Sequence, residues 1–119
     1  MKKKIKPLGP YSQYIFRDNT LYSSGQIAIR PETNDLVNTN IFEETHQIMK
    51  NIKEILISEN LDFENIVKTT IFIVDMNCYN IVNQVYKSYF KNRFPARETV
   101  EVRALPANAN IEISFIAHK

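Results

Sequence analysis

The sequence predicts an α+β fold in which one mixed β-sheet carries two helices packed on a single face. β-prone stretches and segments of helical periodicity follow one another as three strands, a helix, a strand, a helix and two strands. Both helical segments are amphipathic, so each has an apolar stripe to bury against a common sheet. With 119 residues, 44% apolar side chains and no linker-like stretch, the chain is expected to form a single domain over residues 1–119.

The first three predicted strands lie near the N-terminus. Two β-prone stretches, Tyr14–Arg17 and Thr20–Ser23, flank an Asp-Asn pair at 18–19, whose residues readily adopt tight-turn conformations. This pattern predicts a β-hairpin. A third extended stretch is predicted over 26–30, and a polar loop follows over 31–40.

The segment 40–59 has the three-four spacing of a helix with one apolar face. Its apolar residues are Ile48, Met49, Ile52, Ile55 and Leu56. Asn40 and Glu43 have the spacing of a capping box, and Asn60 is suited to the left-handed conformation that ends a helix. We therefore expect a helix between these residues.

The stretch 66–74 is rich in β-branched residues and predicts a strand that is covered on both sides. Strict alternation places Val67, Ile71 and Ile73 on one face, and Ile66, Phe72 and Val74 on the other. The two helices can cover only one face of the sheet, and so small a chain has nothing left to cover the second. Self-association in a closed ring is therefore expected.

A second helix is predicted over 78–90, with Asn77 as its cap, and two last strands over 97–102 and 111–118. The apolar stripe of this helix consists of Tyr79, Val82, Tyr86 and Phe90. A turn-forming stretch, 105–108, separates the two strands. In the last strand Glu112 alternates with apolar residues, so its side chain is expected to face away from them.

Charge and cysteine content narrow the class of protein. The net charge is only +2, and the one basic cluster, Lys2, Lys3, Lys4 and Lys6, forms a tail and not the basic face that nucleic-acid binding usually needs. Cys78 is the single cysteine and can form no internal disulfide, which is typical of a reducing compartment. Without the apolar run of a secretory signal or a membrane span, we expect a cytoplasmic protein.

No common catalytic template appears in the sequence: there is no phosphate-binding glycine loop, no metal-ligand cluster, and no nucleophile signature near either His46 or His118. A dispersed polar set remains: Tyr11, Ser12, Gln13, Ser24, Gly25, Gln26, Arg97 and Glu112. Each member also has a plain structural interpretation, as a turn residue, a packing ring, a solvated strand carboxylate or a surface arginine in a salt bridge. Residue chemistry alone leaves both interpretations open.

The chain also carries an ordered series of short motifs. They include Gly9-Pro10-Tyr11-Ser12-Gln13, Ser24-Gly25-Gln26, Val67-Lys68-Thr69-Thr70-Ile71-Phe72, Phe94-Pro95-Ala96-Arg97, Leu105-Pro106 and Ile111-Glu112-Ile113. Taken together and in this order, they resemble the RidA family, also called YjgF/YER057c/UK114, of imine and enamine deaminases. The resemblance extends over nearly the whole chain.

The resemblance implies a chorismate-mutase-like subunit that forms a homotrimer with a cleft at each subunit interface. It further implies cofactor-free hydrolysis of 2-imino acids, such as 2-iminobutanoate and 2-iminopropanoate, to 2-oxo acids and ammonia. Arg97 would bind the substrate carboxylate with its planar fork of donors, and Glu112 would position or activate the attacking water. The remaining cleft residues implied by the resemblance are Tyr11, Ser24, Gly25, Lys68, Asn83 and Thr99.

One departure from the family pattern lies beside the arginine, where Glu98-Thr99 replaces the more common Ser-Cys. Thr99 is expected to be tolerated because that position acts largely through its backbone. Glu98 would repel an anionic substrate unless it points away from Arg97, which strand alternation predicts. Two alternatives to imine hydrolysis are a non-catalytic, metabolite-binding or chaperone-like trimer and, with less support, an endoribonuclease or translation inhibitor.

Overall fold

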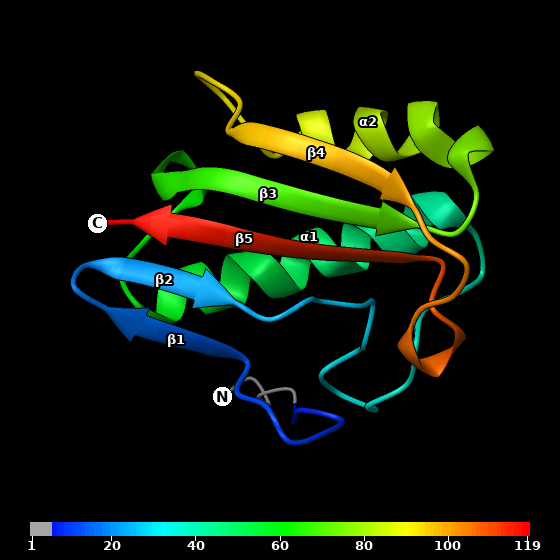
Figure 1. Cartoon of the computed structure of the whole chain (residues 1–119), viewed down its shortest axis with the longest axis horizontal. Helices are drawn as coiled ribbons and strands as arrows, with labels where there is room; N and C mark the ends of the chain where they lie inside the picture. The colour runs from blue at the N-terminus through cyan, green and yellow to red at the C-terminus, as the bar shows by residue number, and fades with distance from the viewer. Residues whose placement is uncertain (1–5) are drawn as a thin grey trace.

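The computed structural model describes residues 6–119, so the predicted basic tail at Lys2, Lys3 and Lys4 lies outside the described residues. The main elements are β1 (Tyr14–Arg17), β2 (Thr20–Ser23), α1 (Ile41–Ser58), β3 (Ile66–Ile73), α2 (Tyr79–Lys87), β4 (Ala96–Glu101) and β5 (Ile111–His118). The strands form one sheet in the order β1-β2-β5-β3-β4, and both helices lie behind it (Figure 1). The β3–β4 pair is parallel and the other pairs are antiparallel. The predicted α+β fold with a mixed sheet is confirmed.

The predicted hairpin is present, with β1 paired to β2. Asp18 and Asn19 both have positive φ, at 51° and 63°, which matches the right-handed twist of the two strands that they connect. Across the described part of the chain, no helix has the length and apolar character needed to cross a membrane.

The predicted third strand at 26–30 is wrong. Only isolated bridges occur there, between Gln26 and Ile113 and between Ile29 and Leu36. The chain turns sharply away from the sheet after the first bridge, because the Ile29 amide donates to the carbonyl of Ile27 only two residues earlier. A stretch that leaves its neighbour after one residue cannot form a ladder.

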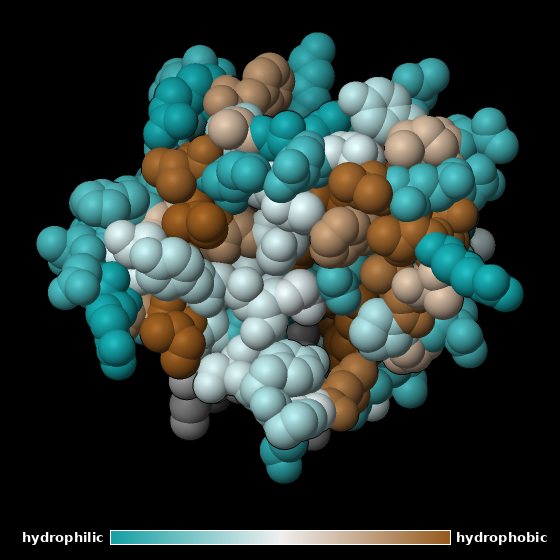
Figure 2. Space-filling view, in the orientation of Figure 1, coloured by the Kyte–Doolittle hydropathy of each residue, from teal (hydrophilic) through white to brown (hydrophobic). Residues whose placement is uncertain are grey.

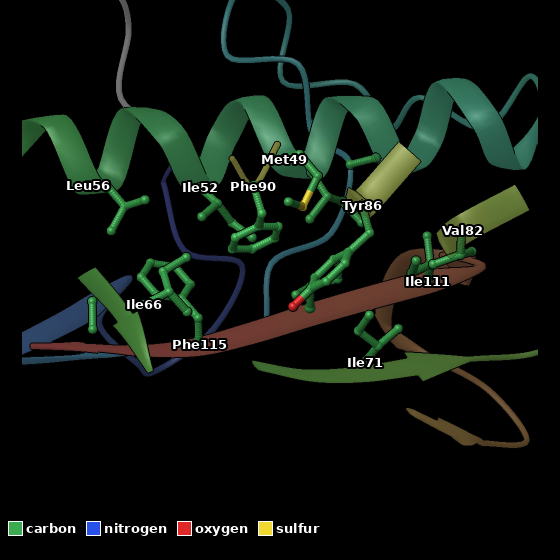
Figure 3. Packing of buried hydrophobic residues seen from close by; sticks show 14 of the residues in the cluster. Met49, Ile52, Leu56, Ile66, Ile71, Val82, Tyr86, Phe90, Ile111 and Phe115 are labelled. Atoms are coloured by element: carbon green, nitrogen blue, oxygen red, sulfur yellow. The ribbon is translucent and has the colours of Figure 1, made fainter. Parts of the chain in front are cut away.

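Helix α1 is close to its predicted bounds. The side chain of Asn40 accepts a hydrogen bond from the Glu43 amide at 2.8 Å, and Asn60, with φ 61°, adopts the predicted left-handed conformation just after the helix. The face of α1 toward the sheet is fully buried. Its main apolar members are Ile48, Met49, Ile52 and Leu56 (Figure 3).

The predicted alternation of β3 is wrong at its start. Ile66 is buried in the core and Val67 is exposed, the reverse of the prediction. The register with β5 shifts between Ile66 and Lys68, so one extra residue is inserted and the side chains before it change face. Beyond the shift, Ile71 and Ile73 share one face as predicted, and that face is buried in the core.

Helix α2 starts differently from the prediction. A short 3₁₀ helix, Met76–Cys78, precedes it, and the capping side chain is that of Asp75, which accepts from the Asn77 amide at 3.0 Å. Asn77 is therefore not the cap. The helix ends at Lys87 and the chain returns as β4 beside β3, which makes β3-α2-β4 a parallel crossover and sets α2 over this edge of the sheet.

The face of the sheet that the helices leave uncovered is partly apolar. It points toward the viewer in Figure 2, where hydrophobic side chains interrupt the polar surface in several places. Ile15, Tyr22 and Val100 are 51%, 50% and 44% exposed. So much exposed apolar surface on one face is typical of an interaction surface.

Candidate active site

Arg97 lies on β4 at the edge of the sheet, on the face that α2 covers. Its strand partner is Thr69, whose side chain is buried and makes a 2.7 Å hydrogen bond with the hydroxyl of Tyr86 on α2. The guanidinium carbon lies 5.0 Å from the centre of the Tyr86 ring and 5.6 Å from that of Tyr79. The Nη2 group donates to the Tyr79 hydroxyl at 3.1 Å. Two aromatic rings and one hydrogen bond therefore hold the cation.

The salt bridge that a surface arginine would be expected to make is missing here. Among the described residues, Arg97 has no carboxylate partner, and the carboxylate next to it in sequence, Glu98, pairs with Lys68 instead. Burial raises the pKa of Tyr86, an effect that its hydrogen bond with Thr69 and the charge of Arg97 oppose. The positive charge of Arg97 is thus not neutralised within this part of the chain and is available to an anion.

A hollow of about 300 Å³ opens beside the guanidinium. It is lined by Asn83, Tyr86, Lys87, Phe94, Pro95 and Arg97. Two polar atoms on this side of the sheet, Oδ1 of Asn83 and Oγ1 of Thr99, are buried without a hydrogen-bond partner. Buried polar atoms are nearly always paired, so both atoms have unused hydrogen-bonding capacity, and of the two residues Asn83 lines the hollow.

Glu112 lies on β5 and faces away from the core, as predicted. Burial raises the pKa of its carboxyl group above the ordinary value. Gly25 packs so closely on this side chain that an added Cβ would overlap the carboxyl group. Any larger residue here would therefore displace the Glu112 carboxyl group, even though the φ of Gly25 is not positive.

Gly25 approaches Glu112 because the chain forms a bulge after Tyr22, the last residue of β2 that pairs with β5. Three residues separate Tyr22 from Gln26, whereas two separate their partners Ile113 and Ile116. Hydrogen bonds hold the bulge to the segment that precedes β1: Ser24 donates from its hydroxyl to the Ser12 carbonyl at 2.5 Å and from its amide to the Gln13 carbonyl at 2.9 Å.

Tyr11 directly precedes Ser12, whose carbonyl contacts the bulge at Ser24. Tyr11 is 46% exposed, and its hydroxyl accepts a hydrogen bond from the Leu8 amide at 3.2 Å. Its ring packs against Gly9. Tyr11, Ser24, Gly25 and Glu112 thus form a second group of predicted residues, separate from Arg97.

Lys68 belongs to neither group. Its ammonium forms a salt bridge of 3.1 Å with Glu98, which also accepts from Thr70 at 3.3 Å, on the face of the sheet that the helices leave uncovered. The hydrogen bond and charge of Lys68 lower the pKa of Glu98. The predicted orientation of Glu98, away from Arg97, is confirmed.

The structure therefore separates the predicted residues onto two faces of one sheet. Arg97 pairs with Thr69, which faces the helices, whereas Glu112 pairs with Phe72, three residues farther along β3 and on the opposite face. A single chain thus presents a cationic half-site with Arg97, Asn83 and Thr99 (below, the arginine half-site). It also presents an acidic half-site with Glu112, Gly25, Ser24 and Tyr11 (below, the glutamate half-site).

Sequence reasoning missed the two tyrosines that contact Arg97. Tyr79 and Tyr86 were assigned only to the apolar packing stripe of the second helix. The sequence does indicate a shared polar face. Tyr79, Asn83 and Tyr86 are spaced by four and three residues, so they lie on one face of the helix, and each side chain has a polar group at its end. Only the position of α2 over β4 shows that this face meets the arginine.

Comparisons with known proteins agree with the predicted family. The family model described as endoribonuclease L-PSP matches residues 1–119. A human 2-iminobutanoate/2-iminopropanoate deaminase is 47% identical over 110 residues, which cover 92% of this chain and 80% of the human protein.

Solved structures agree as well. A protein of the conserved Rid family from Yersinia pestis has a TM-score of 0.95 at 48% identity and covers 100% of this chain and 95% of its own. The structure of E. coli TdcF with bound serine has a TM-score of 0.93 at 30% identity, with 100% and 95% coverage. The chain therefore belongs to the endoribonuclease L-PSP family, whose members include the Rid proteins, and the predicted resemblance is confirmed.

Proposed function

We propose that this protein hydrolyses reactive 2-imino acids, such as 2-iminobutanoate and 2-iminopropanoate, to 2-oxo acids and ammonia. The observation that carries the proposal is the cation of Arg97, which lacks a carboxylate partner among the described residues and lines a hollow of substrate size. The name of the human relative, at 47% identity, supports this reaction. The serine bound to E. coli TdcF supports a site for small molecules with a carboxylate.

In this proposal the arginine half-site binds the substrate. The N–H groups of Arg97 that do not contact Tyr79 engage the carboxylate, for which a planar fork of donors is well suited. Oγ1 of Thr99 and Oδ1 of Asn83, both unpartnered, supply a donor and an acceptor for the ligand's polar atoms. Phe94 and Pro95 form apolar walls for a short aliphatic substituent.

Glu112 acts as the general base. The carboxylate takes a proton from a water molecule as the water oxygen bonds to the imine carbon, and this proton passes to the imine nitrogen, which gives a tetrahedral carbon with one hydroxyl and one amino group. Glu112 then takes the hydroxyl proton and gives it to the amino group. The C–N bond breaks, ammonia leaves and the oxygen forms the carbonyl of the 2-oxo acid. Holding the carboxylate at Arg97 fixes this carbon against the water, so much of the rate enhancement comes from positioning.

The two half-sites point to opposite faces of one sheet, so one subunit cannot supply both to one small molecule. We propose that the protein is a homotrimer in which the arginine half-site of one subunit meets the glutamate half-site of the next. A closed ring uses the same contact three times and would cover the exposed apolar side chains of the free sheet face. Size-exclusion chromatography with light scattering tests the trimer directly.

The activity is tested by coupling the protein to a threonine dehydratase and trapping the released imine with semicarbazide. Wild-type protein should lower the yield of trapped imine, and Arg97→Ala should not. Arg93→Ala is the matched control, because the Arg93 side chain donates to the Glu64 carbonyl and lies outside both half-sites. Equal trapped yields with wild type and Arg97→Ala would contradict the proposal. Binding without turnover in every variant would support a metabolite-binding trimer instead.

Mixed trimers test whether one cleft uses two chains. Arg97→Ala and Glu112→Gln subunits should each be inactive alone, but every trimer that contains both has one cleft with an intact arginine and an intact glutamate. Random co-assembly from equal amounts should therefore restore about a quarter of wild-type activity. If both half-sites acted within one chain, co-assembly would restore none.

A further inference from the structure

Tyr79 makes the one side-chain hydrogen bond that Arg97 has among the described residues. The tyrosine hydroxyl accepts from Nη2 at 3.1 Å, and the centre of its ring lies 5.6 Å from the guanidinium carbon. Tyr79 occupies the first position of α2 and is 38% exposed. It therefore contacts Arg97 from the solvent side of the cluster.

Tyr86, the other ring against Arg97, is held much more firmly. It is 4% exposed, and the hydrogen bond between its hydroxyl and buried Thr69 ties α2 to β3. Figure 3 shows this side chain reaching from α2 toward the sheet. Its ring forms a fixed surface under the guanidinium. A flat ring does not, however, determine how far the guanidinium is turned within its own plane.

The rotation of the guanidinium decides which of its N–H groups face the hollow. An arginine side chain has several rotatable bonds, so holding one bidentate geometry is entropically costly when the ligand alone must impose it. A hydrogen bond from one Nη group to a protein acceptor removes part of this freedom before the ligand arrives. Tyr79 is placed to do this, because it binds Nη2 and leaves Nη1 and Nε free of side-chain acceptors among the described residues.

We propose that Tyr79 is a positioning residue for substrate binding: its hydroxyl presets the rotation of the Arg97 guanidinium so that the remaining N–H groups face the substrate carboxylate. The inference rests on the proposed function, in which Arg97 binds that carboxylate. Tyr79, on α2, thereby contributes to the substrate affinity of a site whose positive charge lies on β4.

Tyr79→Phe tests the inference, because it removes the hydroxyl and keeps the ring. The dissociation constant of 2-oxobutanoate, measured by calorimetry, should rise about fivefold, the factor typical of losing one hydrogen bond, and kcat should change by less than about twofold. The matched control is Tyr89→Phe, which removes a hydroxyl that contacts His46 and is not part of the Arg97 cluster. It should leave both values unchanged.

A double-mutant cycle separates positioning from a general structural effect. In an Arg97→Ala background Tyr79→Phe should have no further effect on 2-oxobutanoate binding, because there is no guanidinium left to orient. Equal affinities of wild type and Tyr79→Phe would overturn the inference, as would the same loss with Tyr89→Phe. If Arg97→Ala itself binds 2-oxobutanoate like wild type, the proposed function fails as well, so the two failures can be told apart.

Discussion

Arg97 and Glu112 point to opposite faces of the same sheet. Their partners on β3, Thr69 and Phe72, are three residues apart, which adds about 10 Å along the strand to the separation across the sheet. No rotamer change brings the two side chains to one small substrate, because the sheet lies between them. If both residues act in one reaction, as proposed, the second of them must come from another copy of the chain.

The raised pKa of Glu112 predicts an unusual acid limit for activity. A general base must be ionised, so kcat/KM should fall as the pH drops through a pKa that lies above that of an ordinary glutamate. Rates measured by imine trapping between about pH 5 and 8 check this, with a dehydratase in excess at every pH. An acid limit at the ordinary carboxylate value would contradict the effect of burial.

The same pKa predicts a gain in stability when the carboxylate is removed. A folded-state pKa above the unfolded value means that the contribution of Glu112 to stability is full below the unfolded pKa and is lost as the pH rises through the folded pKa. At neutral pH the ionised group is therefore unfavourable in the native state. Glu112→Gln should be inactive yet at least as stable as wild type in urea at pH 7, at equal protein concentration. A clear loss of stability would argue that the carboxylate has a structural partner.

Gly25→Ala should reduce turnover through a steric effect on Glu112. The new Cβ would overlap the carboxyl group, so that group must move, and we expect kcat to fall at least about tenfold. Stability should change little, because the displaced group is the far end of a flexible side chain. Binding of 2-oxobutanoate at the arginine half-site should change much less. Gly9→Ala is the control, because a Cβ there meets only the Tyr11 ring at an ordinary 3.4 Å. Unchanged kcat in Gly25→Ala would remove the steric argument.

Elements defined by local chemistry could be predicted from the sequence. The turn at 18–19, the Asn40 cap and the outward orientation of Glu112 depend on neighbouring residues only. Elements defined by pairing could not. The bulge at Val67 requires the register between β3 and β5, and a strand at 26–30 would need a continuous partner that the fold does not supply.

The same distinction applies to the candidate site. Strand alternation correctly placed Glu98 opposite to Arg97, because only adjacent residues are involved. The placement of Arg97 and Glu112 on different faces depends on the pairing of three strands, which no local pattern contains. The contact of Tyr79 with Arg97 depends on how α2 lies over β4, and it was missed for the same reason.

For binding of an anionic ligand at Arg97, we expect the position of a carboxylate in space to matter more than its distance along the sequence. Its carboxylate pairs with Lys68 on the far face from Arg97, so Glu98→Gln should change the dissociation constant of 2-oxobutanoate by less than about twofold. Asn83→Asp places a carboxylate in the hollow beside Arg97 and should weaken the same binding about tenfold or more. Calorimetry at low salt compares the two variants. A larger effect from Glu98→Gln would mean that Glu98 reaches the substrate after all.

The hydrogen bond between Thr69 and Tyr86, next to the arginine half-site, should make the contributions of these two residues to stability non-additive. Their 2.7 Å hydrogen bond is buried, so Thr69→Val, which keeps the side-chain shape, leaves the Tyr86 hydroxyl without a partner. The unfolding free energy should fall by about 1–3 kcal/mol. Tyr86→Phe should lower it similarly, because the Thr69 hydroxyl is then unpaired. The double variant removes both polar groups at once and should lose less than the sum of the two single losses, by about 1 kcal/mol. Urea unfolding at one protein concentration measures all four proteins, and strictly additive losses would show that the two hydroxyl groups act independently.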